Sequence, residues 1–569
     1  MMHSWLPGKV EEFLDWDWSQ IEPIFQNLQQ RELDTDNVGT WLDEWSDISK
    51  LLDESYSRLY DATTVNTGDE AAERRFTHFL DEIRPKAKSA EQRLKEKLLA
   101  SEIFPNGYQV ALRDLQAQAE IYREENQLLL SEEKKLVIDY DKIIGAQTVA
   151  WDGEQVPLPQ LQPVYEEADR ERREKAWRLT AARQIEDRQA LNDLYRQFLE
   201  LRHSIAVNSG LPNYRAYRWK ELLRFDYSAD DCYQFHQAIE NAVVPVALEI
   251  YEARRQRLGL SELRPWDLAV DTFGMPALKP FGTTEELLDK SEKIFSAVAP
   301  QFGVNFGKMR AEGLLDLENR ANKAPGGYCN YYRYSGQPFI FMNAVGIHED
   351  VQTLLHEGGH AFQLFECGQR PYFFLEIPSE FAEVASMAME LLSSPYLESD
   401  KGGFYSPGEA ARARIQHLES VLLFWPYMAV VDAFQHWVYE NQQAALVADN
   451  LDSCWAQLWE RFMPGVDWGG LEQEMMTGWQ RKVHIFDEPF YYIEYGMAQL
   501  GSVQIWQNAI ENQAQAVAAY RQALSLGTSV TLPELYQTAG IRFAFDEGSL
   551  QAAVNTIKET IDNLEKVIG

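Results

Sequence analysis

The residues of this chain with the clearest capacity for chemistry are His356, Glu357 and His360, which form the pattern H-E-x-x-H within an apolar run. On a helix of about 3.6 residues per turn, histidines four residues apart share one face, so both rings can reach one zinc ion at about 2.0–2.1 Å. Glu357 points about 100° around the helix from His356, where it would miss the metal but reach a water beside it. The pattern therefore predicts two zinc ligands and a general base from one helical turn.

The alternative is a pair of core histidines beside a solvated glutamate. Gly358 and Gly359, inside the motif, count against it. A glycine within a helix costs up to about 1 kcal/mol relative to alanine, and two in succession indicate that another segment approaches the backbone closely.

A third ligand must come from another segment. The next candidate helix begins near Pro378, a residue that suits a first helical turn, and it is rich in small residues that allow close packing. The carboxylates in this region belong to Glu376, Glu380, Glu383 and Glu390. Glu383 ranks first because small residues flank it in an apolar helix, where an unpaired carboxylate would be costly. The alternative for Glu383 is a surface carboxylate.

The motif and the segment 381–386 (Phe-Ala-Glu-Val-Ala-Ser) together resemble the thimet oligopeptidase and oligoendopeptidase F family of zinc metallopeptidases, and most closely its oligoendopeptidase F branch. The resemblance runs from about Tyr165 to the C-terminus. It implies a zinc-dependent endopeptidase that hydrolyses internal bonds of short, unstructured oligopeptides. Gln363 departs from the pattern, because many members carry a further histidine there, although that histidine is not a metal ligand.

Other segments extend the resemblance. His484 and the segment 489–496 look like the family's histidine–tyrosine substrate site, and the segments 324–328 and 338–343 look like its glycine-rich loop and edge strand. The residues that we expect to act are His356, His360 and Glu383 on one zinc ion, Glu357 as base, His484, Tyr492 and Tyr495 as oxyanion donors, and Gly326, Gly327, Tyr328, Phe339 and Tyr491 as substrate contacts, with Tyr491 also a reserve donor. Asp350, Gln352 and Glu380 are candidate hydrogen-bond partners of the histidines.

Two other functions stay open. A helical zinc carboxypeptidase or dipeptidase would need an arginine or lysine that binds a terminal carboxylate, and the sequence does not identify one. A catalytically silent peptide-binding scaffold is disfavoured, because base, ligands and oxyanion donors are all present. Blocked and unblocked peptides would separate these functions from an endopeptidase.

The net charge limits the classes of molecule that this protein is expected to bind. The 569 residues carry a net charge of −35, which should repel nucleic acid and anionic membranes, and no basic patch offsets it. The acidity serves solubility or attracts cationic peptides. The four cysteines are far apart, no signal peptide is evident, and the apolar run 421–431 is too short to span a bilayer. We therefore expect a cytoplasmic protein with reduced thiols. The oligomeric state stays open.

The elements that position these residues are mostly helical. Residues 1–155 read as an N-terminal helical region and 156–569 as the catalytic domain, with one long helical pattern over 165–208. Strand signals are confined to 144–152, which ends in the turn dipeptide Asp152-Gly153, and to 326–343. The latter is either a structural hairpin or an edge strand that pairs with substrate. The fold class predicted is mainly α with a small β element beside the motif helix. The resemblance implies an ellipsoid with a deep central channel and the zinc on its floor.

Overall fold

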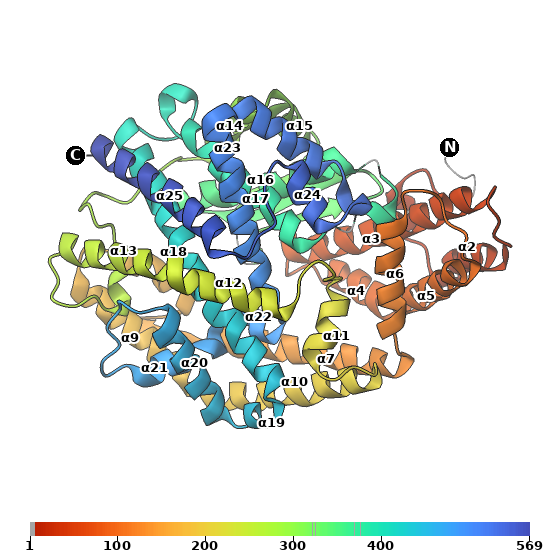
Figure 1. Ribbon diagram of the computed structural model, residues 1–569, viewed down its shortest axis with the longest axis horizontal. Helices are drawn as coiled ribbons and strands as arrows, with labels where there is room; N and C mark the ends of the chain where they lie inside the picture. The colour runs from red at the N-terminus through yellow and green to blue at the C-terminus, as the bar shows by residue number, and fades with distance from the viewer. Residues whose placement is uncertain (1–5, 321, 325, 369, 376, 569) are drawn as a thin grey trace.

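Helices form most of the described chain, and two small sheets complete it (Figure 1). The computed structural model describes residues 6–320, 322–324, 326–368, 370–375 and 377–568, except for the side chains of residues 138 and 141. The predicted mainly helical fold is confirmed. Glu376, one of the four candidate ligands, lies outside the described residues.

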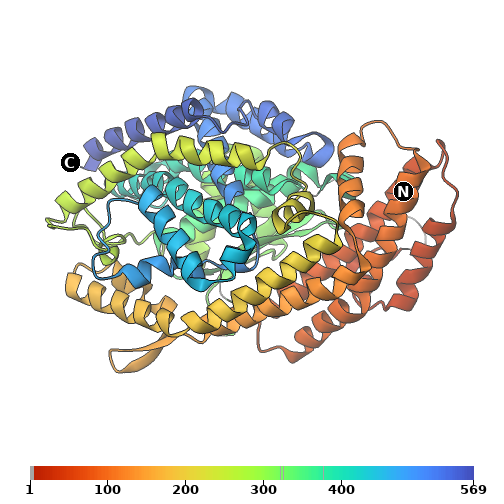
Figure 2. The ribbon, with the colours of Figure 1, turned by 60° about the horizontal axis from the view of Figure 1, so that its bottom comes forward.

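The first helices gather at one end of the molecule, coloured red to orange in Figures 1 and 2. They are α1 (Val10–Phe13), α2 (Trp18–Gln30), α3 (Val38–Val65), α4 (Glu70–His78), α5 (Arg84–Ser101) and α6 (Gln109–Ile121). The apolar face of α3 is buried in a core that these helices form, where Trp41 packs edge-on against Trp45 with ring centroids 5.3 Å apart. That core extends from Leu6 to Leu115, and the larger core of the molecule starts at Ile121. The division at residue 155 stays a prediction.

The next elements lead into the larger core. They are α7 (Glu124–Gly145), β1 (Thr148–Trp151), β2 (Glu154–Pro157), α8 (Gln162–Tyr165), α9 (Arg170–Glu186), α10 (Arg188–Asn208), α11 (Tyr214–Glu221), α12 (Ala229–Ala242), α13 (Val244–Arg257), α14 (Thr284–Val298) and α15 (Pro300–Ala311). β1 and β2 pair antiparallel and form a hairpin around the predicted turn Asp152-Gly153. The single helix expected over 165–208 is wrong, because Asp187 separates α9 from α10 and its carboxylate accepts hydrogen bonds from Gln147 and Arg183.

The last third of the chain is again helical. It comprises α18 (Pro407–Glu440), α19 (Gln442–Ala445), α20 (Ala448–Phe462), α21 (Glu472–Met476), α22 (Val483–Phe486), α23 (Tyr492–Leu524), α24 (Leu532–Thr538) and α25 (Glu547–Ile568). The apolar run 421–431 lies within α18, which contains Pro426 and is buried along most of its length. Within the described chain, none of the helices combines the length and apolarity needed to cross a bilayer.

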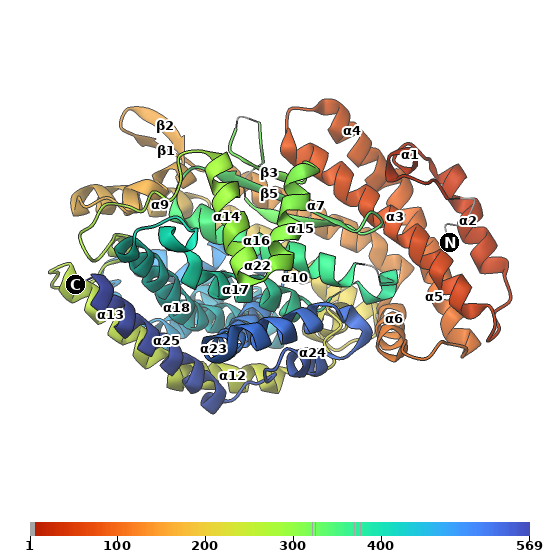
Figure 3. The ribbon, with the colours of Figure 1, turned by 90° about the horizontal axis from the view of Figure 1, so that it is seen from above.

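The second sheet lies beside the motif helix, as expected (Figure 3). Its strands are β3 (Leu315–Glu318), β4 (Tyr328–Tyr332) and β5 (Gln337–Ala344), in the order β3-β5-β4. β5 pairs antiparallel with β4 and parallel with β3. The segment 338–343 is therefore the central strand, and the prediction that it forms an edge was wrong because the short β3 was not foreseen.

The motif helix α16 (His348–Cys367) packs against α17 (Ser379–Ser393). Asp350 begins α16, because its Oδ2 accepts the N–H groups of residues 345–347 at 2.7–3.0 Å. A Cβ on Gly359 would lie 2.5 Å from the carbonyl oxygen of Ala385 on α17, and one on Gly358 would lie 2.5 Å from Cζ of Phe295. The close approach that the two glycines predicted is confirmed, and it brings the two helices that carry the candidate ligands together.

Candidate metal centre and peptide site

The three residues predicted to hold zinc lie together. Nε2 of His356 is 3.4 Å and Nε2 of His360 is 3.8 Å from Oε2 of Glu383. Donor atoms bound at about 2.0–2.1 Å to a tetrahedral zinc ion are about 3.4 Å apart. One donor atom from each residue lies within 4.8 Å of the others, and two imidazoles with one carboxylate are a zinc donor set. These residues therefore fit a zinc ion with little adjustment.

Glu357 is placed beside this cluster rather than in it. Its side chain is buried, yet it lines a cavity of about 140 Å³ together with His356, Thr353 and Glu390. Burial raises the pKa of Glu357 to about 7. A carboxylate with a pKa near neutrality, next to open space, suits a group that accepts and returns a proton.

The carboxylate of Glu390 forms a hydrogen bond with His356, a role that the sequence analysis did not assign to it. Nδ1 of His356 lies 2.6 Å from Oε1 of Glu390, whose Oε2 lies 2.8 Å from Nε2 of His417 on α18. Burial opposes ionisation of Glu390, but the hydrogen bonds from both histidines lower its pKa to about 2. Glu390 is therefore a charged acceptor that orients the His356 ring and leaves Nε2 directed toward Glu383 and His360.

The partners expected for the histidines engage elsewhere. Asp350 accepts the N–H groups at the start of α16, Gln352 contacts His348, and Glu380 accepts a hydrogen bond from Tyr227 at 2.8 Å. The expectation that these three side chains position the histidines was wrong. Asp350 and Gln352 contact groups within five positions in the sequence, whereas Glu380 contacts Tyr227, 153 positions away.

The predicted histidine–tyrosine group forms a compact aromatic cluster. His484 on α22 has its ring centroid 6.1, 5.1 and 5.9 Å from the rings of Tyr491, Tyr492 and Tyr495. The hydroxyl of Tyr491 donates to Oε1 of Glu383 at 3.1 Å, which links the cluster to the metal ligands. Tyr492 is the buried member, and Tyr495 is only partly covered. Burial lowers the pKa of His484 to about 4, so at pH 7 the ring is neutral and keeps one N–H to donate.

Three buried arginines hold the segment that carries this cluster. Arg202, Arg218 and Arg224 come from α10, α11 and the loop after α11. Their guanidinium groups donate to the carbonyl oxygens of Ile485, Phe486, Pro489 and Phe490. Arg224 also donates to Glu494 at 2.6 Å. These contacts fix Phe490 at a φ of 67°, a left-handed conformation that a bulky residue adopts only when its surroundings impose it.

The predicted substrate contacts upstream divide into two groups. Gly326 and Gly327 are exposed, and a Cβ on Gly327 would lie 3.2 Å from Thr353 on α16, so this loop passes close to the motif helix. Tyr328 is held by its hydroxyl, which lies 3.0 Å from Asp61 on α3. Phe339 is 8% exposed and stacks on Tyr332 at 5.9 Å. Phe339 is thus a core residue of the sheet, and its position does not support contact with a peptide.

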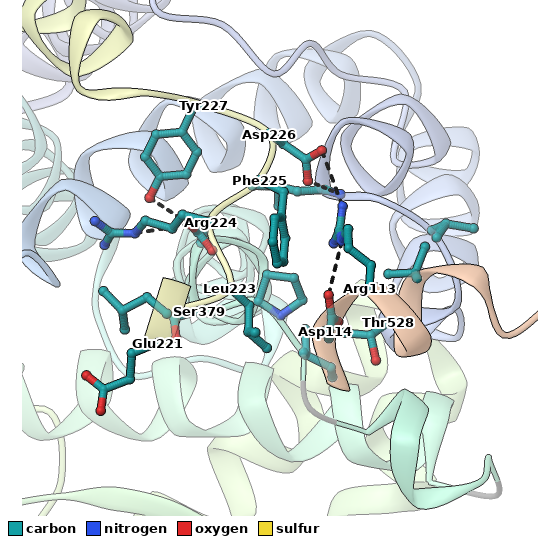
Figure 4. Close-up of a pocket in the computed structure, with 17 residues that line it drawn as sticks. Arg113, Asp114, Glu221, Leu223, Arg224, Phe225, Asp226, Tyr227, Ser379 and Thr528 are labelled. Carbon is teal, nitrogen blue, oxygen red and sulfur yellow. Dashed lines mark hydrogen bonds and ion pairs between the residues drawn. The ribbon is translucent and has the colours of Figure 1, made fainter. Parts of the chain in front are cut away.

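A separate cavity of about 160 Å³ lies between α6, the loop 221–227 and the start of α17 (Figure 4). Arg113 pairs there with Asp114 at 3.1 Å and lies 3.8 Å from Asp226. Figure 4 shows Arg224 and Tyr227 on the other side of Phe225. Arg113 thus joins α6 to the loop 221–227, and Arg224 of that loop lies 3.9 Å from Glu380 of α17.

Comparison with known proteins assigns this chain to a family. The sequence profile described as peptidase family M3 matches residues 164–555. The chain belongs to peptidase family M3. Oligopeptidase PepF of Bacillus subtilis strain 168 is 22% identical over 340 residues, a match that spans 58% of this chain and 48% of that protein, so the chain matches about half the length of this curated relative.

Solved structures match the M3 chain over nearly its whole length. PZ peptidase A with an inhibitor has a TM-score of 0.87 and 28% identity, covering 99% of this chain and 98% of its own. A structure described as an oligoendopeptidase F has a TM-score of 0.88 and 29% identity, covering 97% and 98%. The family resemblance inferred from the motifs is therefore confirmed, and it includes the oligoendopeptidase F branch.

Parts of this M3 site escaped sequence reasoning for different reasons. Glu390 follows Glu383 by seven residues, two helical turns, so a shared face was readable, but its role as a hydrogen-bond acceptor was not. His417 lies on α18, and no spacing connects it to the motif. The three arginines looked like ordinary charged residues on helices, since only the folded chain shows which carbonyl groups they reach.

Proposed function

We propose that this M3 peptidase is a zinc-dependent endopeptidase that hydrolyses internal bonds of short, unstructured oligopeptides. The observation that carries the proposal is the cluster of His356, His360 and Glu383, whose donor atoms have the spacing that one zinc ion requires. A bound zinc ion would supply a Lewis acid that polarises the peptide carbonyl and acidifies water. The names of the relatives, an oligopeptidase and an oligoendopeptidase F, support peptides as substrates.

Glu357 moves the proton in this mechanism. Its carboxylate accepts a proton from the attacking water and then donates it to the nitrogen of the leaving amine. Because a cation beside Glu357 would lower its pKa from the value set by burial, the group would be ionised before the attack at neutral pH. Glu390 holds the His356 ring in place through Nδ1 while this occurs.

The negative charge that develops on the carbonyl oxygen needs further donors. We assign this role to the N–H of His484 and the hydroxyl of Tyr495, which lie together at the partly covered side of the aromatic cluster. Tyr492 was an equal candidate from the sequence, but it is 5% exposed and packs against Phe424, so it supports the other rings. Tyr491 contacts Glu383 and is placed to orient that ligand as well as a substrate.

One zinc ion per chain is proposed, although a second group of ligand-type residues exists. Cys232, Asp432 and His436 have donor atoms within 4.8 Å of one another. However, Nη1 of Arg215 donates to Nδ1 of His436 at 3.0 Å, which places the proton of a neutral ring on Nε2, facing Asp432 at 3.3 Å. A protonated nitrogen has no lone pair for a metal, so this group is better explained as a buried hydrogen-bond network.

The cysteines and the net charge indicate where the protein acts and what it binds. Cys232, Cys329, Cys367 and Cys454 are all unpaired, which supports a reducing compartment, and we propose the cytoplasm. The net charge of −35 disfavours nucleic acid and anionic membranes as partners. Oligopeptides are the proposed substrates, entering a channel that ends at the metal cluster.

The test uses purified protein and a pool of peptides with free or blocked ends, analysed by mass spectrometry. An endopeptidase cuts blocked peptides at internal bonds. Release of only C-terminal residues or dipeptides, with blocked peptides left intact, would favour a carboxypeptidase. Binding of peptides without any cleavage at saturating zinc would favour a peptide-binding scaffold.

A further inference from the structure

A half-buried lysine lies against the aromatic cluster. Nζ of Lys482 is 4.2 Å from the centre of the Tyr492 ring and 5.4 Å from that of Tyr427 on α18. His484, two residues later in the chain, packs on the same tyrosine, with its ring 5.1 Å from that of Tyr492. Lys482 therefore contacts the aromatic cluster that contains the proposed oxyanion donors.

This ammonium group has no anionic partner among the described residues. No carboxylate of that part of the chain lies within 4.0 Å of Nζ of Lys482, which packs on the two tyrosine rings. Burial alone lowers the pKa of Lys482 to about 8, and no carboxylate acts in the opposite direction. A half-buried cation without a counterion is costly in the free protein, and a bound anion would remove that cost.

The neighbouring residue adds to the positive potential. Arg481 is also half-buried, and its Nη2 donates to the carbonyl oxygen of Glu474 at 2.9 Å rather than to a carboxylate. Its charge acts on Tyr427, the same ring that Lys482 contacts. Among the described residues, neither cation has a carboxylate within 4.0 Å, although the more distant charge of Glu474 acts on Arg481.

We propose that Lys482, with Arg481 beside it, forms a subsite for a carboxylate of the peptide substrate. The inference rests on the proposed peptidase function. Two sources of this chemistry exist, a free C-terminus and an aspartate or glutamate side chain. From the ring of Tyr491, which contacts Glu383, the steps to Tyr495, to Tyr492 and to Nζ of Lys482 are 5.1, 5.6 and 4.2 Å. This path of about 15 Å is spanned by at most about five extended residues at about 3.3 Å each, so the carboxylate that binds is within about five residues of the bond that is cut.

The subsite also opposes the overall charge of the protein. The net charge of −35 repels acidic peptides as they approach the protein. Once a peptide has entered, the two cations attract its carboxylate. The preference for a carboxylate should therefore appear in binding after entry. Raising the salt concentration weakens it less than it would weaken an exposed pair, because buried charges are screened less.

The experiment compares matched internally quenched peptides in two arms. One arm places glutamate or glutamine at each position from the second to the fifth residue from the cleaved bond, and the other ends the chain there as a free acid or an amide. The native chain should favour the acid by about tenfold in kcat/KM, about the effect of one charge-assisted hydrogen bond. In Lys482→Met, which keeps the apolar stem, the ratio of acid to neutral peptide should fall to near one, and Lys482→Arg should restore most of it.

A binding measurement separates this inference from the proposed function. Fluorescence anisotropy of the same peptides with a Glu357→Gln chain reports the preference without turnover, so it decides the question even if the native chain cleaves nothing. The control is Lys401→Met, a surface lysine paired with Glu398 at 3.1 Å, which should keep the native ratio. An acid-to-neutral ratio that is the same in the native chain and in Lys482→Met, by both measurements, would overturn the subsite. The arm that shows the preference identifies the source of the carboxylate.

Discussion

Replacing Glu390 with glutamine tests whether the metal cluster depends on the carboxylate behind it. The substitution keeps the shape of the side chain and removes its charge. The hydrogen bond from Nδ1 of His356, 2.6 Å long, would change from a charge-assisted contact to a neutral one. His417, 2.8 Å from the other carboxylate oxygen, would then face an amide that offers N–H donors instead of an acceptor.

The size of the effect follows from these contacts. Charge-assisted hydrogen bonds are roughly twice as strong as neutral ones. Loss of a partner behind a metal-binding histidine typically weakens metal affinity or activity by about 10- to 100-fold. We therefore expect Glu390→Gln to bind zinc about 10- to 100-fold more weakly, which corresponds to about 1.4–2.7 kcal/mol. At saturating zinc a large part of the activity should return.

The assay is competition for zinc with a chromogenic chelator, followed by peptide turnover across a zinc titration. Glu366→Gln is the matched control, because Glu366 lies on the motif helix but pairs with Arg521 at 2.7 Å. An unchanged zinc affinity in Glu390→Gln would refute the orienting role. A loss as complete as that of Glu383→Ala would show instead that Glu390 is itself a ligand.

Three further outcomes are expected. Glu383→Ala should lose or strongly weaken zinc, because one of three protein ligands is gone, and retention of tight zinc binding would require another third ligand. Tyr495→Phe should lower kcat by about 10²–10³-fold with little change in KM, as for other lost oxyanion donors, whereas a native kcat would move the role to His484. The proposed channel can be tested with peptides of different length and with a stably folded protein. Short peptides should be cut and the folded protein should survive. Efficient cleavage of the folded protein would contradict a narrow channel.

The motif could be predicted from sequence because its chemistry is local. His356, Glu357 and His360 lie within one helical turn, so their spacing states their geometry. The prediction of Glu383 as the third ligand required one more step. The small residues around it and the glycines of α16 indicate that two helices are in close contact. A Cβ on Gly359 would lie only 2.5 Å from the carbonyl oxygen of Ala385, so a larger residue there would force the two helices apart.

The rest of the site depends on contacts between distant segments. β3 is a strand of four residues that pairs with β5 only in the folded chain, so β5 looked like an edge strand. His417 meets Glu390 across 27 residues, and Arg202 reaches Phe486 across 284. Periodicity describes the faces of single helices, and it does not state which faces meet. The break at Asp187 depends in part on such a contact, because its carboxylate accepts a hydrogen bond from Gln147, 40 residues away, as well as one from Arg183, four residues earlier.

The central claim is that zinc on His356, His360 and Glu383 works with Glu357 as the base. The most direct test is one preparation each of the native chain and Glu357→Gln, measured for zinc by mass spectrometry and for cleavage of one internally quenched peptide. We predict about one zinc per chain in both proteins, and turnover lower by about 10²–10⁴-fold in Glu357→Gln, the typical share of general acid–base catalysis. Loss of zinc together with activity would make Glu357 a ligand, and native turnover in the variant would contradict the account.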